Sequence, residues 1–335
     1  MKRHTGLVLV ALALTGTFPA GQTPAVAPKG RPATAAEAKG WTVPRTADGQ
    51  PDLQGTWDYR TLTPLERPRE YAGKEFLTDA EIADLERRAA EREDGRPPGD
   101  ARTLPSVHPP WWLDYGRKVV GTRRSSLIID PPDGRVPALT ADAQKREAAR
   151  RAATRGRGPS DGPEDRTLWE QCVTRGLPEG MLPAGYNNNV KIFQTPGYVV
   201  ILMEMIHDAR IIPLDGRPHL PPNIRSWMGD PRGRWEGSTL VVETTNFSDA
   251  VSFHGSGSGL RLVERFSRVD AHTIDYRFTV DDPTTWARPW TVDFPLVMSD
   301  GEIYEYACHE GNYGLLNILR NARAEEAAAE GAKNK

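Results

Sequence analysis

The second half of the sequence alternates apolar and polar side chains in short runs that are joined by brief turns. A period of two is typical of half-buried β-strands, and connections of two or three residues indicate antiparallel hairpins. Eight or nine strands are enough to close a small barrel, so we expect a mainly β protein built around an antiparallel barrel. The predicted strands are Gly55–Tyr59, Val190–Thr195, Tyr198–His207, Ala209–Leu214, Ser238–Asn246, Leu260–Val269, Thr273–Asp281, Trp290–Val297 and Ile303–Cys308.

The composition also favours a loop-rich β protein, because the chain has 31 glycines, 29 prolines and a hydrophobic fraction of 38%. In the first half, Thr78 and Glu81 form a capping-box pattern that predicts a short helix. The sequence leaves open whether this half wraps the barrel or forms a separate lobe. The expected division is 51–185 for the first strand and a long irregular, partly helical extension, 186–320 for the barrel domain, and 321–335 for a helical or disordered tail.

The N-terminus has the pattern of a secretory signal peptide. Lys2 and Arg3 precede an apolar run, Leu7–Leu14, which is too short to span a bilayer. Cleavage would remove residues 1–27 and leave a leader, 28–50, which we expect to be disordered. We therefore predict a periplasmic or secreted protein with no membrane anchor after cleavage.

The charge balance favours a small-molecule partner over a polyanion. The formal net charge is −2, with 43 basic and 45 acidic residues. Such a balance gives no electrostatic reason to expect nucleic acid or an anionic membrane as a partner. The sequence does not determine the oligomeric state.

The chain has two cysteines, Cys172 and Cys308. In an exported protein, an isolated pair predicts a disulfide, because a metal site would need more ligands at short spacing. The alternative is two buried free thiols.

Strand alternation places several ionisable groups on apolar faces. Glu264 shares its face with Leu262 and Phe266, and Tyr276 shares its face with Phe278. A carboxylate in such a place is costly unless it is paired or reached by water. The two interpretations are an interior ion pair, with Arg210, Arg265 or Arg277 as its partner, and a functional site inside the barrel.

A site in this barrel would combine histidines with carboxylates. An imidazole beside a carboxylate can move protons near neutral pH. Because His207 ends an apolar strand and precedes Asp208, we expect it at the barrel mouth, where His309-Glu310 could meet it. The candidate catalytic residues are His207, His309, Glu204 and Glu264, and the candidate ligand-binding residues are Tyr276, Trp235, Trp286, Arg210 and Glu310.

Two functions follow from these residues. The first is binding of a small apolar or aromatic molecule in a barrel pocket, and the second is a hydrolase, lyase or isomerase that works without an organic cofactor. A packed barrel with a structural role is a third possibility. No metal site is expected, because the histidines lack H-x-H or H-E-x-x-H spacing.

Two resemblances add to these expectations. The first rests on six motifs: Asp52-Leu53-Gln54-Gly55-Thr56-Trp57, Arg210-Ile211-Ile212-Pro213-Leu214-Asp215-Gly216-Arg217, Arg234-Trp235-Glu236-Gly237, Leu240-Val241-Val242-Glu243-Thr244, Thr279-Val280-Asp281-Asp282-Pro283 and Cys308-His309-Glu310-Gly311-Asn312-Tyr313. In these motifs the chain resembles a family of exported bacterial proteins of unassigned function, which implies export and a largely β fold but no reaction. Separately, Gly55-Thr56-Trp57 before a run of strands is similar to the start of the lipocalins and their calycin relatives, which implies a lipocalin-like (calycin-like) barrel.

Overall fold

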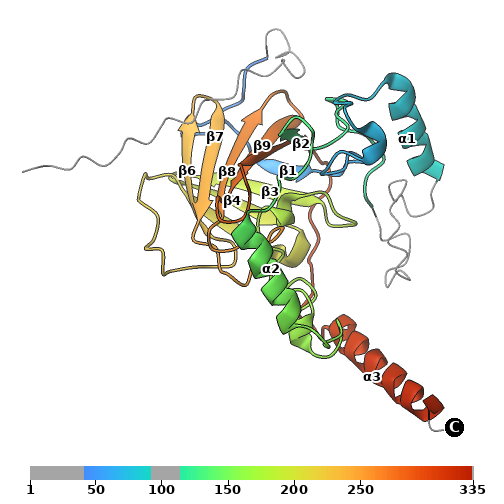
Figure 1. Cartoon of the computed structure of the whole chain (residues 1–335). Coiled ribbons are helices and arrows are strands. Elements are labelled where there is room, and N and C mark those ends of the chain that lie inside the picture. Colours follow the sequence, from blue (N-terminus) through green and yellow to red (C-terminus); the bar gives the residue numbers. More distant parts are fainter. Residues whose placement is uncertain (1–40, 92–113, 334–335) are drawn as a thin grey trace, which may run out of the picture. The chain divides into compact units, whose positions relative to one another are not determined.

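The computed structural model describes residues 41–91 and 114–333, and the predicted signal peptide and most of the predicted leader lie outside them (Figure 1). Nine antiparallel strands form a nearly closed barrel in the order β5-β4-β3-β1-β10-β9-β8-β7-β6, and a short strand, β2, pairs with β10. The expected mainly β fold with an antiparallel barrel is therefore confirmed. The strands are β1 (Gly55–Asp58), β2 (Ile128–Asp130), β3 (Asn189–Thr195), β4 (Tyr198–Met203), β5 (Ala209–Pro213), β6 (Asp230–Glu236), β7 (Thr239–Thr245), β8 (Arg261–Arg268), β9 (Thr273–Asp281) and β10 (Trp290–Met298).

Two strand predictions need correction, and one strand was not predicted. Ile303–Cys308 is not a strand, because its backbone is bound by side chains of other segments and pairs with no strand. The strand that begins at Tyr198 ends at Met203 and is followed by a 3-10 turn, Met205–His207. The ninth barrel strand is instead β6, whose Asp-Pro-Arg-Gly-Arg sequence lacks an apolar pattern.

The barrel interior is filled by the apolar faces of the strands. In β9 every second residue is buried, which confirms the face predicted from alternation. Tyr276 stacks on Phe266 with ring centroids 4.7 Å apart and meets Phe294 edge to face at 5.2 Å. Near the end of β8, the Arg268 guanidinium lies 5.4 Å from the Trp57 ring, which is fully buried.

The barrel has a seam where β5 and β6 lie side by side without a hydrogen-bonded ladder. Close packing substitutes for the ladder at this place. A Cβ on Gly233 of β6 would stand 2.7 Å from Ile212 Cγ2 and 2.6 Å from Leu214 Cδ2. A side chain at position 233 would therefore push the two edges apart.

In the described part of the chain, three α-helices lie outside the barrel: α1 (Asp79–Glu91), α2 (Ala141–Ala153) and α3 (Tyr313–Lys333). The predicted capping box at α1 is confirmed, since Glu81 N–H donates to Thr78 Oγ1 and Thr78 N–H donates to Glu81 Oε2. The C-terminal helix starts at Tyr313, earlier than the predicted tail. Among the residues that the structure describes, no helix combines the length and the apolar character needed to cross a bilayer.

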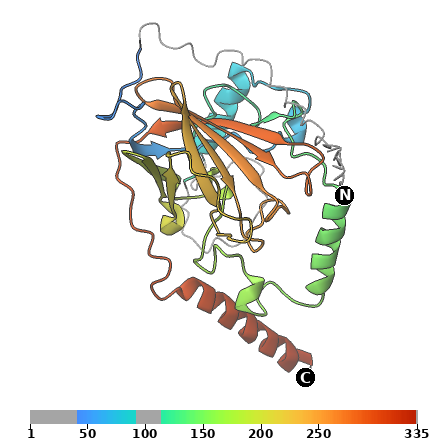
Figure 2. The same ribbon diagram turned by 90° about the vertical axis from the view of Figure 1, so that its left-hand side faces the viewer.

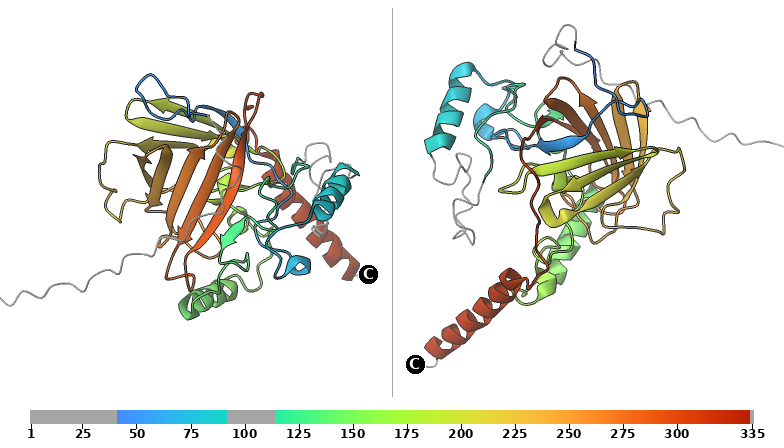
Figure 3. Two further views of the ribbon diagram at one scale, coloured as in Figure 1. Left: turned by 90° about the horizontal axis from the view of Figure 1, so that it is seen from above. Right: turned by 180° about the vertical axis from the view of Figure 1, so that it is seen from behind.

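The segment between β10 and α3, residues 299–312, runs along the barrel past β3 and β4 (Figure 2 and Figure 3). We call it the C-terminal strap. Lys191 Nζ on β3 lies 2.7 Å from Glu302 Oε2, and further along the strap Cys308 forms a disulfide with Cys172. The predicted disulfide is thus confirmed, and it indicates a non-reducing environment.

Candidate functional site

The predicted site residues Glu264, Tyr276 and Arg210 come together in the barrel interior. Arg210 Nη1 donates to Glu264 Oε1 over 2.9 Å, the second guanidinium nitrogen pairs with Oε2, and the Tyr276 hydroxyl donates to Oε1 over 2.8 Å. Their exposed fractions are 2% for Arg210 and 0% for the other two. Glu264 is therefore in an interior ion pair with Arg210, one of the three partners considered from the sequence.

The electrostatics of this cluster follow from burial and from the pairing. Burial disfavours the charged form of Arg210, but Glu264 outweighs this effect and raises the arginine pKa above its ordinary value. Burial, followed by the charge of Glu264, raises the Tyr276 pKa well above its ordinary value. Tyr276 is consequently a neutral hydrogen-bond donor at physiological pH. The Arg210–Glu264 pair connects β5 with β8, which lie on opposite sides of the β5–β6 seam.

Glu204 and His207 lie at the β4–β5 corner, residues 204–208, and His309 lies beside it on the strap. The His207 and His309 rings lie 6.0 Å apart and both side chains are exposed. His207 Nδ1 is 2.9 Å from the Tyr306 carbonyl oxygen of the strap. The buried Glu204 carboxylate accepts from Asn189 Nδ2 and from the Tyr304 N–H. The structure thus places the two histidine rings near each other, while Glu204 binds the backbone of the strap.

The remaining candidates are dispersed. Trp286 is 1% exposed and packs edge to face on Trp290 at 5.6 Å, and Trp235 is half-buried on β6. Neither Trp235 nor Trp286 has a partner for its indole N–H among the described residues. Glu310 is exposed on the strap. Their binding roles stay predictions.

Replacing His207 by alanine is expected to change the melting temperature by only a few degrees. The ring is exposed and makes one hydrogen bond, which contributes about 1 kcal/mol. Thermal unfolding measures this change, with exposed His272, on the β8–β9 turn, replaced by alanine as the control. A binding or catalytic role also predicts loss of ligand binding; a much lower melting temperature with unchanged binding would assign His207 to structural support.

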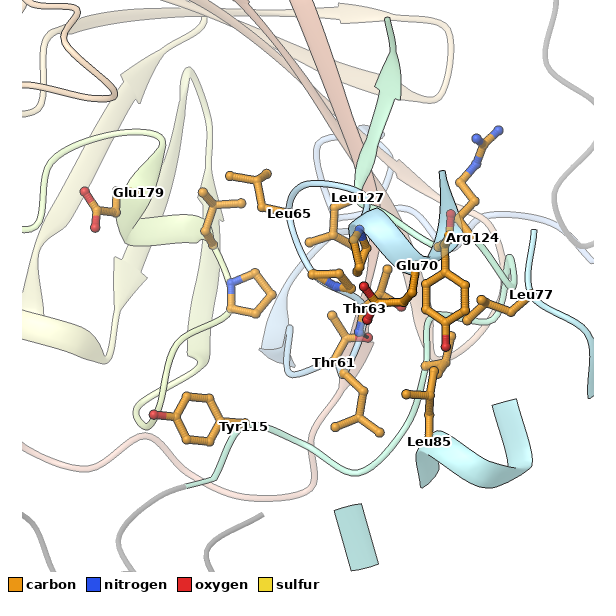
Figure 4. Close-up of a pocket in the computed structure, with 18 of the residues that line it drawn as sticks. Thr61, Thr63, Leu65, Glu70, Leu77, Leu85, Tyr115, Arg124, Leu127 and Glu179 are labelled. Atoms are coloured by element: carbon orange, nitrogen blue, oxygen red, sulfur yellow. Dashed lines mark hydrogen bonds between the residues drawn. The ribbon is translucent and has the colours of Figure 1, made fainter. Parts of the chain in front are cut away.

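A pocket of about 610 Å³ lies at the loop end of the barrel, where β3 and β8 begin and β9 ends (Figure 4). Segments from the extension, from the stretch before β3 and from the β7–β8 connection form its walls. Sequence reasoning missed this site, because its residues follow no strand or helix period. Its apolar walls include Leu62, Leu65, Val119, Leu127, Leu182 and Phe253.

Arg175 is a largely buried charged residue of this pocket. Its side chain is 11% exposed, and its guanidinium lies 5.0 Å from the Trp169 ring. Nη2 is 3.9 Å from Glu179 Oε1, whereas Nε and Nη1 are buried without a hydrogen-bond partner among the described residues. Buried donors are normally satisfied, so two unpartnered nitrogens on one guanidinium are unusual.

The β4–β5 corner holds the segment that presents Arg175. Asp208 Oδ2 accepts from Thr174 Oγ1 over 2.9 Å, and the Asp208 carboxylate also accepts from the Arg175 backbone N–H. Burial raises the pKa of Asp208, and these two hydrogen bonds oppose that shift. Ile206 and His207 have φ of 60° and 49°, a conformation that is unfavourable for a β-branched residue. This strained corner directs Asp208 toward Thr174.

A second, polar groove of about 830 Å³ lies between α2 and the Gly-Ser loop, residues 255–259. Its charged groups are already engaged: Arg150 and Arg151 pair with Glu147. Burial opposes ionisation of Asp282, but hydrogen bonds from Ser256, Thr285 and Thr284 outweigh it and lower the pKa. The groove is thus held together by its own polar contacts.

The described residues contain no group of three or more His, Cys, Asp or Glu placed to hold a metal ion. Comparison with family models, curated proteins and solved structures finds no match to this chain. The resemblance to an exported family and the lipocalin comparison therefore stay predictions.

Proposed function

We propose that the protein binds a small apolar or aromatic molecule in the loop-end pocket and does so outside the cytoplasm. The observation that carries this proposal is the pocket itself, whose volume of about 610 Å³ falls within the range of small-molecule sites. The Cys172–Cys308 disulfide supports the location, because such bonds persist in oxidising compartments. Export in turn agrees with the predicted signal peptide.

The pocket suits a ligand better than the barrel interior does. Leu65, Leu127 and Leu182 lie on its apolar wall, and Thr61 and Thr63, whose hydroxyls bind backbone groups, lie along one side (Figure 4). Around Glu264, by contrast, the interior is occupied by fully buried aromatic rings. We therefore place the ligand at the end of the barrel and assign the interior ion pair to stability.

The neutral dye N-phenyl-1-naphthylamine tests the proposal, because its fluorescence rises in apolar surroundings. We expect saturable binding to the purified protein with a micromolar Kd. Leu65→Trp, which puts a large ring into the pocket, should weaken binding at least tenfold without a large change in melting temperature. Leu220→Trp, at a site that is 45% exposed outside the pocket, is the matched control. Absence of saturable binding, or equal binding by the Leu65 variant, would refute the proposal.

A further inference from the structure

We infer that the ligand carries a planar acidic group that Arg175 binds, and that Asp208 is the positioning residue for this guanidinium. The inference rests on the proposed function, because it names the class of ligand for the same pocket: an aromatic or apolar acid. Nothing in the sequence distinguishes Arg175 from the other arginines of the chain.

The guanidinium has the donors for such an acid. Nε and Nη1 of Arg175 are buried without a protein partner among the described residues. A guanidinium presents its N–H groups in a planar fork that matches the two oxygens of a carboxylate. The surroundings are mostly apolar, so a charged hydrogen bond there is stronger than one in open solvent.

The neighbouring residues keep the fork in place. The Trp169 ring lies 5.0 Å from the guanidinium carbon, which favours a cation over its face. On the backbone side, Asp208 binds Thr174 Oγ1 and the Arg175 N–H, and Thr174 Oγ1 also accepts from Gly176 N–H over 2.9 Å. Gly176 has φ of 69°, and a Cβ there would stand 2.5 Å from Val251. The segment consequently has little freedom to turn Arg175 elsewhere.

The other charged groups of the pocket leave Arg175 as the anion-binding group. Arg124 is paired with Glu75 over 2.6 Å and lies over the Phe76 ring at 5.0 Å. The Glu179 side chain is half exposed, and its carboxylate points away from Thr63 in Figure 4. Glu70 and His254 are exposed at the pocket. Among the basic side chains of the lining, Arg175 therefore keeps two donors that no carboxylate of the described residues occupies.

Two isosteric competitors test the ligand class on the unmodified protein. At pH 7, 2-naphthoate and its neutral amide, 2-naphthamide, each displace N-phenyl-1-naphthylamine from the purified chain. We expect the acid to bind about tenfold to a hundredfold more tightly, since hydrogen bonds to charged groups are the strong ones. Arg175→Met should abolish this preference and leave the neutral dye bound. Arg124→Met, in the same pocket, should retain it.

The positioning role of Asp208 is tested by the same ratio of the affinities for 2-naphthoate and 2-naphthamide. Asp208→Ala should reduce the preference for the acid over the amide severalfold, and Asp208→Asn, which keeps one acceptor oxygen, should restore part of this preference. An equal loss of affinity for acid and amide would mean a merely structural role and would overturn the assignment of Asp208.

The outcomes separate the two proposals. If the dye binds but the acid and the amide displace it equally, the acidic ligand class is wrong, and the proposed binding of an apolar or aromatic molecule in the pocket is unaffected. The same conclusion follows if Arg175→Met leaves the preference intact. If the dye does not bind at all, the proposed function itself fails.

Discussion

Replacing Arg210 by methionine is expected to destabilise the protein by about 3–5 kcal/mol, because it leaves the buried Glu264 carboxylate without its cation. Both members of this pair are almost fully buried, and Tyr276 supplies the only other side-chain hydrogen bond to Glu264 among the described residues. Glu264→Leu should have an effect of similar size, because it leaves the buried Arg210 guanidinium without its anion. Urea unfolding monitored by tryptophan fluorescence measures these changes.

The double variant makes this prediction specific. When Arg210→Met and Glu264→Leu are combined, no unpaired charge remains, so the loss should be much smaller than the sum of the two single losses. Arg261→Met is the matched control, since its pair with Glu243 lies on the outer barrel surface with side chains that are 47% and 27% exposed. That variant should lose no more than about 1 kcal/mol. Additive single losses would show that the pair does not act as a unit.

Removing the Cys172–Cys308 disulfide is expected to have the second large effect. The bond joins residues that are 136 positions apart. On the chain-entropy account, a loop of this length restricts the unfolded chain enough to stabilise the fold by roughly 4–5 kcal/mol. The double variant Cys172→Ser/Cys308→Ser should therefore unfold at a clearly lower urea concentration.

Reduction of the unmodified protein provides the control for this variant. Treatment with dithiothreitol should lower its unfolding midpoint to that of the double serine variant, whose own midpoint should not respond to the reductant. If neither reduction of the unmodified protein nor the double serine substitution lowers the unfolding midpoint, the strap contacts of Glu204 and His207 hold the C-terminal segment without the covalent bond.

Features set by local chemistry were accessible from the sequence. Period-two alternation identified eight of the nine barrel strands and placed Glu264 and Tyr276 on the buried faces, because strand geometry sends neighbouring side chains to opposite sides. The capping box at Thr78 was equally local. The disulfide followed from an isolated pair of cysteines in a chain with a predicted signal peptide.

Features that depend on distant segments were decided by the tertiary structure. Ile303–Cys308 alternates like a strand, yet it pairs with no strand edge in the described part of the chain. Its backbone groups bind the Glu204 and His207 side chains instead. The pairing of Arg210 with Glu264 depends on the chain path between two strands, so the sequence offered three arginines without choosing among them.

The pocket shows the same limit most clearly. Arg175 follows no periodic pattern, and its position depends on the Trp169 ring and on the Asp208 carboxylate, which accepts from its backbone N–H. A sequence therefore determines which face of a strand a residue occupies, since that depends on its neighbours in the chain. Which buried donors meet a partner is decided only when segments that are separate in the chain are packed together, because hydrogen bonds and ion pairs act over a few ångströms in space.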